Sequence, residues 1–245
     1  MTLQVQLFIT CLGENFYPDM LRDMVAVLER LGVECLLPKN QTCCGQPFYN
    51  SGLGQLALPA ARQWLRAFAE TDGIIVAPSA SCVGFVRKVY SHLFPEGTPE
   101  HEAARQASAR TYEFTEFLTH VMQVSDVGAY FPHRVTFHAS CHPLRELGLR
   151  DEPKWLLQQV RGLELVPLAG EETCCGFGGS FSVIYPEVSG RMMAKKIRDI
   201  DESGAEVVVM TETGCLMNVQ GGLHAVHSPV TAMHLIQVLA QQEQY

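Results

Sequence analysis

The segment Thr42-Cys43-Cys44-Gly45 occurs a second time in the chain, 131 positions later, as Thr173-Cys174-Cys175-Gly176. That displacement is close to half of the 245 residues. An identity at this spacing indicates an internal duplication, in which one structural unit is built twice. We therefore expect an N-terminal repeat over residues 1–127 and a C-terminal repeat over residues 128–245.

The other cysteines follow nearly the same displacement. Cys141 lies 130 positions after Cys11, and Cys215 lies 133 positions after Cys82. Eight of the nine cysteines therefore form two equal sets, namely Cys11, Cys43, Cys44 and Cys82 in one half and Cys141, Cys174, Cys175 and Cys215 in the other. The ninth, Cys35, lies in a short apolar run, and we expect it to be a core residue because a free cysteine packs as a small hydrophobe.

Each half alternates short β-branched runs with longer helical patterns, which is typical of a parallel sheet with crossover helices. We expect strands at residues 3–10, 33–37, 73–77, 134–138, 163–168, 205–210 and 223–226. We expect helices near residues 20–31, 101–122 and 185–203. The predicted fold class is α/β, with two similar Rossmann-like parallel-sheet halves related by a pseudo-two-fold axis.

Composition excludes several classes of function. Charged residues make up 18% of the chain, the net charge is −8, and no cluster of basic residues is present, which argues against a nucleic-acid partner. No apolar stretch is long enough for a membrane span. We expect a cytoplasmic protein, and in such a reducing compartment clustered cysteines serve more often as metal ligands or redox centres than as disulfides.

The cysteines of both sets follow predicted strands. Since open α/β sheets bind ligands beyond the carboxyl ends of their strands, four thiolates in each half should converge on one rim. Soft thiolate ligands select iron–sulfur clusters or zinc. Zinc is the alternative because a structural zinc site also takes four thiolates, but its ligands commonly arrive in closely spaced pairs that this chain lacks. The spacing thus favours an iron–sulfur cluster.

The cysteine pattern, with Gln41-Thr42-Cys43-Cys44-Gly45-Gln46-Pro47 and Cys174-Cys175-Gly176-Phe177-Gly178-Gly179, resembles the cysteine-rich CCG domain of heterodisulfide reductases and of the iron–sulfur components of glycolate oxidases. Within that superfamily, nearly the full length is similar to the lactate utilization protein A family. The resemblance implies a cytoplasmic iron–sulfur component of an L-lactate oxidation system. It also implies two partners, a ferredoxin-like iron–sulfur subunit and a third lactate-utilization subunit.

The chain departs from the fullest CCG pattern at one position in each half. That pattern ends in C-x-x-C and supplies five cysteines to an unusual cluster, whereas Ser79 and Glu212 replace the first cysteine of the final pair here. A carboxylate is a better metal ligand than a hydroxyl at neutral pH, so we expect Glu212 to lie within reach of the C-terminal metal site. We expect Ser79 only to donate a hydrogen bond to sulfur. The alternative for Glu212 is a solvated turn residue.

His138, just before Cys141, is a further candidate. It either donates a hydrogen bond to cluster sulfur or is a buried histidine whose own hydrogen bonds are satisfied.

The predicted function is that of an iron–sulfur electron-transfer subunit, an oxidoreductase component that needs partner subunits to oxidise lactate. No residue set indicates a hydride acceptor, a flavin site or an arginine cluster for lactate, so the catalytic residues are not predicted. Two alternatives stay open at this point. One is a scaffold subunit stabilised by structural zinc or a cluster, and the other is a cofactor-free dithiol redox protein that uses Cys43-Cys44 or Cys174-Cys175.

Overall fold

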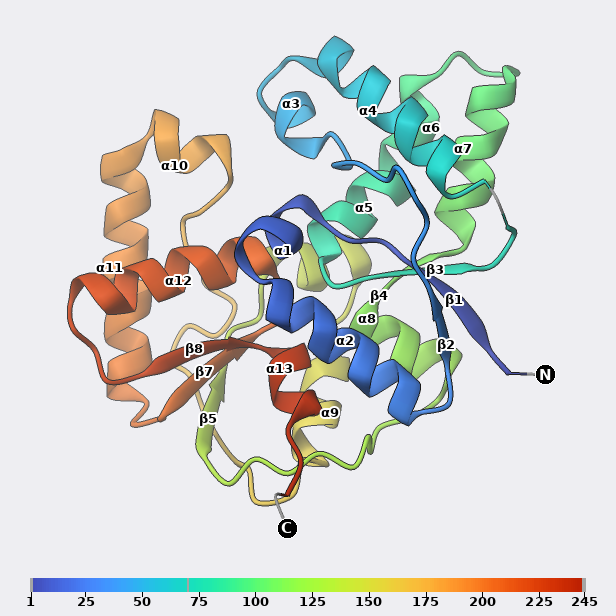
Figure 1. Cartoon of the computed structure of the whole chain (residues 1–245). Coiled ribbons are helices and arrows are strands. Elements are labelled where there is room, and N and C mark those ends of the chain that lie inside the picture. The colour runs from blue at the N-terminus through green and yellow to red at the C-terminus, as the bar shows by residue number, and fades with distance from the viewer. Residues whose placement is uncertain (1, 70, 244–245) are drawn as a thin grey trace. The chain divides into compact units, whose positions relative to one another are not determined.

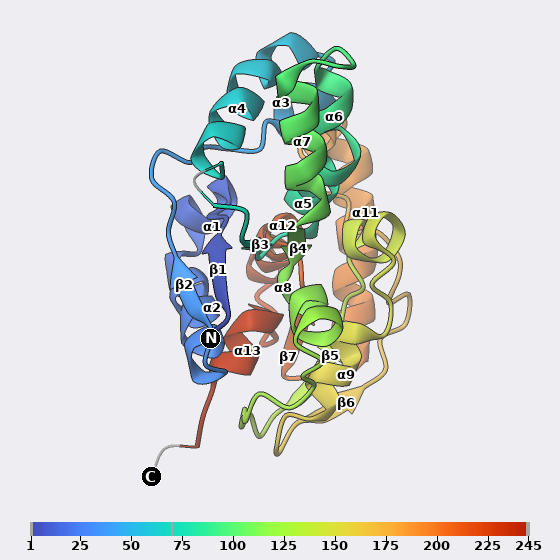
Figure 2. The ribbon, with the colours of Figure 1, turned by 90° about the vertical axis from the view of Figure 1, so that its right-hand side faces the viewer.

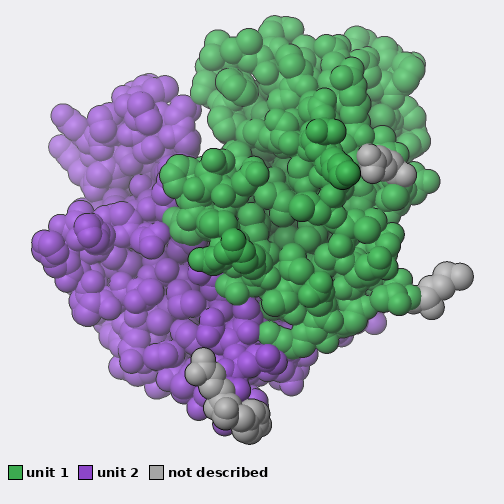
Figure 3. All heavy atoms as spheres, in the orientation of Figure 1, with its two compact units in different colours: residues 1–117 green, residues 118–245 purple. Residues whose placement is uncertain are grey.

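The chain folds into two α/β units, which a computed structural model describes over residues 2–69 and 71–243. The compact units are Met1–Phe117 and Leu118–Tyr245 (Figure 3). Each contains one four-stranded parallel sheet flanked by helices, so the predicted α/β class with two similar halves is confirmed (Figure 1). The repeat boundary between residues 127 and 128 stays a prediction.

The sheet of the first unit has the strand order β2-β1-β3-β4, and all its pairs are parallel. Its strands are β1 (Gln4–Leu7), β2 (Glu34–Leu36), β3 (Ile74–Ala77) and β4 (Thr111–Glu113). The helices of this part of the chain are α1 (Cys11–Phe16), α2 (Pro18–Arg30), α3 (Gln46–Asn50), α4 (Gly54–Ala67), α5 (Ala80–Lys88), α6 (Tyr90–Leu93), α7 (Pro99–Ala109) and α8 (Phe114–Glu116). Helix α5 packs against β3, β4 and α7 (Figure 2).

The second unit repeats this topology with the order β6-β5-β7-β8. Its strands are β5 (Arg134–Phe137), β6 (Glu164–Val166), β7 (Val207–Met210) and β8 (Thr231–His234). A π-helix, η1 (Phe117–Val121), links the units, and the later helices are η2 (His142–Leu147, also a π-helix), α9 (Glu152–Gln158), α10 (Ser180–Ile184), α11 (Pro186–Glu202), α12 (Thr213–Ala225) and α13 (Leu235–Ala240).

The strand registers of the two sheets match, which supports the duplication. Val5 pairs with Cys35 in the first sheet, and Val135 pairs with Leu165 in the second. Cys35 therefore occupies the position of Leu165, which lies 130 residues later in the sequence. It is only half-buried, however, because β2 lies at the edge of its sheet.

Helix α2 forms where the apolar residues recur at helical spacing. Pro18 begins it, in a position where the missing N–H costs nothing, and Gly32 follows its end with a φ of +77°. Its buried face carries Met20, Met24 and Val27 among others. This face covers part of the apolar core of the first unit.

An aromatic cluster fills that core. Trp64 packs edge-on against Phe8 and Tyr90, with 5.4 Å between ring centroids in both pairs. Phe68 stacks on Trp64 at 4.4 Å in a tilted arrangement. These four side chains are fully buried. They fix Phe8, which directly follows β1, and Tyr90, whose hydroxyl reaches the backbone of Cys44.

Two expected elements are wrong in part. The helix expected near residues 101–122 ends at Ala109, and β4 follows, because the β-branched and aromatic residues Thr111 and Tyr112 complete the sheet edge beside β3. The strand expected at 223–226 is the end of α12, and β8 begins at Thr231 after a turn that contains Pro229. In both places a short apolar run was compatible with either element.

No helix in the described part of the chain is both long enough and apolar enough to cross a lipid bilayer.

Glu113 ends β4 and caps α8 from a fully buried position. Its Oε2 accepts hydrogen bonds from the backbone N–H groups of Thr115 and Glu116, at 2.7 and 3.2 Å, while its Oε1 has no hydrogen-bond partner among the described residues. Burial raises the pKa of Glu113 to about 8. The ionised carboxylate therefore costs stability in the folded state.

We expect this cost to appear as a pH dependence of unfolding. The unfolded carboxyl loses its proton at about pH 4.3 and the folded one at about 8, so between these values only the folded state keeps the proton and stability falls as pH rises. Glu113→Gln keeps a cap acceptor without the titration. In urea unfolding, the free energy of unfolding of the variant should rise relative to that of the wild type, by on the order of a few kcal/mol, as pH increases from about 5 to 9. A constant difference over this range would contradict the raised pKa.

Candidate metal centre

The eight paired cysteines occupy equivalent places in the two units. Cys11 begins α1 and Cys141 directly precedes η2, so each follows the central strand of its sheet. Cys82 and Cys215 are the third residues of α5 and α12. Each vicinal pair lies in the loop after the edge strand, β2 or β6. Each set thus gathers at the carboxyl ends of its sheet, as the sequence predicts.

The set in the first unit brings two buried sulfurs close together. Cys44 Sγ lies 3.6 Å from Cys82 Sγ. The backbone N–H of Gly45 donates to Cys43 Sγ at 3.5 Å, and the hydroxyl of Tyr90 donates to the carbonyl of Cys44 at 2.8 Å. The core therefore holds the vicinal turn in place through Tyr90.

The set in the second unit has the same arrangement. Cys175 Sγ lies 3.4 Å from Cys215 Sγ, and the N–H of Gly176 donates to Cys174 Sγ at 3.3 Å. The carbonyl of Cys175 accepts from the side-chain amide of Asn218 at 3.0 Å. Asn218 thus holds the backbone of the vicinal turn in this unit, as Tyr90 does in the first unit.

A glycine follows each vicinal pair because the backbone turns there into the left-handed region. The φ angle is +91° at Gly45 and +89° at Gly176. This conformation is strained for residues with a side chain. It lets two adjacent cysteines present their sulfurs to one site, which regular strand or helix geometry does not allow.

Gln41 ties the loop of the first vicinal pair to β1. Its Oε1 accepts from the N–H of Ile9 at 2.7 Å, and its Nε2 donates to the carbonyls of Leu7 and Pro38 at 3.2 and 3.1 Å. These bonds satisfy backbone groups just past the strand end. They also hold Cys43 on the same side of the sheet as Cys11.

The thiols of the first set share protons. Hydrogen bonds from Cys11 and Cys44 hold the pKa of Cys43 at about 3, while the same bonds raise the pKa values of the two donors. Cys43 therefore accepts hydrogen bonds from both neighbours and readily carries negative charge. Thiols that donate to a neighbouring sulfur form a donor set in which a metal ion can replace the protons.

The thiols of the second set are coupled by hydrogen bonds in the same way. Hydrogen bonds from Cys141 and Cys175 hold the pKa of Cys174 at about 2. The pKa of Cys215 is also well below its usual value, first through Cys175 and then through the nearby His138 and Ser140. A bound cation would stabilise negative charge on these sulfurs, since part of the site is buried.

Ser79 and Glu212, the two residues that replace a cysteine of the CCG pattern, lie in equivalent places. Each caps the helix that carries the last cysteine, with nearly the same backbone angles, φ/ψ of −135°/115° and −134°/119°. Glu212 is buried, with 4% of its surface exposed, so it is not a solvated turn residue. The pKa of Cys141 is raised first by its hydrogen bond with Cys174 and by burial, and in smaller part by nearby charges that include Glu212. Ser79 Oγ lies 3.1 Å from Ser81 Oγ. The predicted ligand role of Glu212 stays a prediction.

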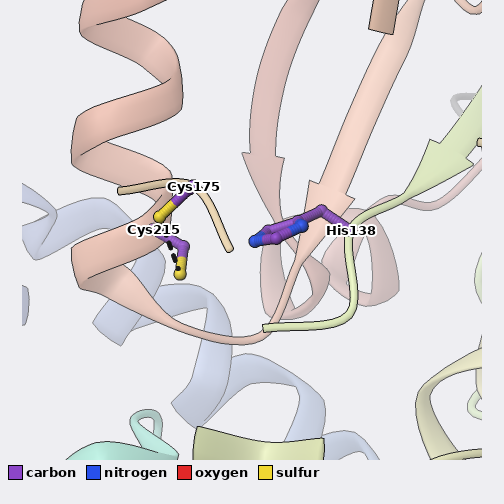
Figure 4. A group of neighbouring side chains, drawn as sticks. All are labelled: His138, Cys175 and Cys215. Atoms are coloured by element: carbon purple, nitrogen blue, oxygen red, sulfur yellow. Dashed lines mark hydrogen bonds between the residues drawn. The ribbon is translucent and has the colours of Figure 1, made fainter. Parts of the chain in front are cut away.

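His138 lies against the second set (Figure 4). Its ring, Cys175 and Cys215 each offer a ligand atom, and these three atoms lie within 4.8 Å of one another in a fully buried position. Glu212 is not one of these three donors. The residue equivalent to His138 in the first unit is Phe8, since the N–H of Phe8 donates to Val76 and that of His138 donates to Val209 at the matching strand.

Each set is open to solvent on one side. A cavity of about 440 Å³ lies beside Cys11 and Cys43 in the first unit. A cavity of about 630 Å³ lies beside Cys174 in the second, with Arg145 and Lys154 in its lining. The first two cysteines of each set are half-buried and the last two are buried. A bound group would therefore have one side near solvent and one in the protein.

The donors fit an iron–sulfur cluster or zinc. All eight cysteines are free thiols, and the sulfur separations of 3.6 and 3.4 Å are far beyond a disulfide bond. Two sulfurs on one tetrahedral metal lie about 3.8 Å apart, close to these separations. Both metals take such ligands, so the donor set fits either.

Sequence reasoning missed two positioning residues, Tyr90 and Asn218. Tyr90 stands in a short helix beyond the last cysteine of the first set, and no motif marks it. Asn218 lies three residues after Cys215 on the same helix, so its spacing was visible in the sequence. Its partner, a backbone carbonyl 43 residues away, was not.

Comparison with known proteins identifies related chains. The cysteine-rich CCG domain family matches residues 5–87 and 135–220, one stretch in each unit. Lactate utilization protein A of Geobacillus thermodenitrificans is 46% identical over 238 residues, which cover 97% of this chain and 98% of that protein. The protein of the same name from Shouchella clausii is 41% identical over 241 residues, which cover 98% of this chain and all of that protein.

A solved structure shares the fold at low identity. The crystal structure of a hypothetical protein from Helicobacter pylori aligns with a TM-score of 0.66 at 11% identity. The alignment covers 99% of this chain and 49% of that one, so the present chain spans about half of its length. At this identity the similarity supports the fold alone.

Proposed function

The chain belongs to the lactate utilization protein A family, and we propose on that basis that it is an iron–sulfur electron-transfer subunit of an L-lactate oxidation system. The observation that carries the proposal is the pair of four-thiol sets at the carboxyl ends of two equivalent sheets. Cys11, Cys43, Cys44 and Cys82 would hold one group and Cys141, Cys174, Cys175 and Cys215 the other. When bound, an iron–sulfur cluster supplies one-electron chemistry that protein side chains lack.

The chain's own groups suit that role. The N–H groups of Gly45 and Gly176 donate to the sulfurs of Cys43 and Cys174, and such bonds stabilise negative charge on sulfur. The buried cysteines keep water from one side of each site. The half-buried cysteines leave the other side near the surface, where an electron can pass to a partner.

We further propose that the partners are a ferredoxin-like iron–sulfur subunit and a third lactate-utilization subunit. Exposed apolar side chains support the need for a partner. Val183, Ile184, Tyr185 and Val188 follow the Cys174-Cys175 turn in the chain, and each exposes at least half of its surface. Exposed apolar residues gathered in one segment are typical of interaction sites.

A zinc-stabilised scaffold is the second candidate function. The sulfur separations of 3.6 and 3.4 Å are compatible with it, because two sulfurs so close suit a single metal ion. Such a protein would organise the other subunits without carrying electrons.

Anaerobic purification followed by iron, acid-labile sulfide and zinc analysis tests the proposal. We expect iron and sulfide in similar amounts, with a broad visible absorption that bleaches with reductant. With L-lactate and an artificial acceptor, we expect reduction only after the partner subunits are added. Stoichiometric zinc without sulfide would favour the scaffold, and lactate oxidation by this chain alone would make it an enzyme in its own right.

A further inference from the structure

His138 has one ring nitrogen whose role is fixed by its surroundings. Nδ1 lies 3.2 Å from the backbone carbonyl of Glu171. A carbonyl oxygen can only accept, so Nδ1 carries the proton and donates it. In the neutral imidazole the other nitrogen, Nε2, then presents a lone pair. A histidine that binds a metal is commonly held in this way, with its other N–H bonded to a backbone carbonyl.

Nε2 is buried without an ordinary hydrogen-bond partner. His138 has no exposed surface, and Nε2 makes no hydrogen bond of normal geometry to any described residue. The ring does interact with the sulfur of Cys215. A buried polar atom left in this state costs stability. It lies in the group with the sulfurs of Cys175 and Cys215, within 4.8 Å (Figure 4). The nitrogen therefore points toward the buried cysteines of the second set (Figure 4).

The fold does not require a histidine at this position. In the first unit the equivalent residue is Phe8, whose ring packs edge-on against Trp64 and Phe68 at 5.4 and 5.7 Å between centroids. An apolar ring therefore fits at the equivalent position of the same fold. The histidine introduces a buried polar atom beside the second cysteine set.

We propose that His138 Nε2 is a metal ligand together with Cys175 and Cys215, so that the C-terminal site is a mixed nitrogen and sulfur site while the N-terminal site binds through sulfur. The inference rests on the proposed function in that both require metal in the C-terminal thiol set. It adds that the two sites are chemically different. A neutral imidazole ligand brings less negative charge to a metal than a thiolate, which raises the reduction potential.

The other nearby histidine has a different setting. His142 Nδ1 lies 3.8 Å from Cys141 Sγ, but its Nε2 faces Glu146 at 3.7 Å, and its side chain is partly exposed. It does not belong to the buried group of three donors. His142 therefore serves as the matched control, a histidine beside the same cysteine set.

Zinc bound to the metal-free, full-length protein tests the inference. In a Cys43→Ser/Cys44→Ser background, one equivalent of zinc should bind at the C-terminal set, and X-ray absorption at the zinc edge should show sulfur and imidazole scattering. His138→Phe, which copies the residue of the first repeat, should remove the imidazole signal and weaken zinc binding by about 10–100-fold. His142→Phe should change neither.

A sulfur-only spectrum of the background protein overturns the inference, and so does an imidazole signal that survives His138→Phe. If His138→Phe does not fold, the spectrum of the background protein still decides, since it retains the native histidine. The zinc spectrum is independent of the native metal. If zinc has an imidazole ligand but the isolated protein carries no iron, the inference holds and the proposed function fails. If zinc has only sulfur ligands but the isolated protein carries iron, the proposed function holds and the inference fails.

Discussion

Cys175→Ser is expected to abolish metal binding in the C-terminal unit and to leave the N-terminal unit loaded. Cys175 Sγ donates to Cys215 Sγ at 3.4 Å and belongs to the donor group with His138. Serine keeps the size and hydrogen-bonding capacity of the side chain but is a poor ligand for soft metals. Iron and sulfide should fall to about half of the wild-type content if each set holds one equal group.

Cys44→Ser is the mirror variant and should produce the same loss in the first unit. Cys35→Ser is the control, because Cys35 is a free thiol on an edge strand that belongs to neither set. Its metal content should equal that of the wild type. Full metal content in Cys175→Ser would show that this sulfur is not a ligand. Complete loss in either single variant would show that the two sets hold one shared group.

The two equivalent cysteine sets could be predicted from sequence, because the same spacing of cysteines occurs twice along the chain. Displacements of 130 to 133 positions place every set member after a matching strand, and the topology of a parallel sheet then gathers them at one rim. Sequence patterns placed the other six strands correctly, since each lies in a short, largely apolar run. It failed at β4 and β8, where short runs lie next to long helices and neighbouring strands decide the conformation.

The asymmetry of the two sites was only partly predictable. Sequence alone identifies Ser79 and Glu212 as the residues that break the cysteine pattern, but not that Glu212 is buried. The proton position on His138 depends on a carbonyl 33 residues away, that of Glu171. The contrast with Phe8 becomes clear only once the strand pairing shows that the two residues are equivalent. Such features depend on tertiary contacts that no local pattern encodes.

Gly176→Ala is expected to destabilise the second unit by about 2–4 kcal/mol, because backbone strain and overpacking add at this position. The φ angle of +89° is unfavourable for any residue with a Cβ. A Cβ at this position would also lie 2.9 Å from the carbonyl oxygen of Ser189 and 3.0 Å from Cβ of Met192. Both neighbours belong to α11, a 17-residue helix. The turn must therefore shift, and Cys174 and Cys175 shift with it.

Gly45→Ala and Gly190→Ala distinguish the effect of backbone strain from that of overpacking. At Gly45 the φ angle is similarly positive, but the nearest atoms, those of Ala57, lie at 3.3 Å, so we expect a smaller loss of about 1–2 kcal/mol. At Gly190, within α11, a Cβ meets no atom within 4 Å, and alanine should stabilise the helix by about 0.5–1 kcal/mol. Urea unfolding of the metal-free proteins measures all three without interference from bound metal. If Gly176→Ala proved as stable as the wild type, the vicinal cysteines would not depend on this left-handed turn, and their convergence on one site would need another cause.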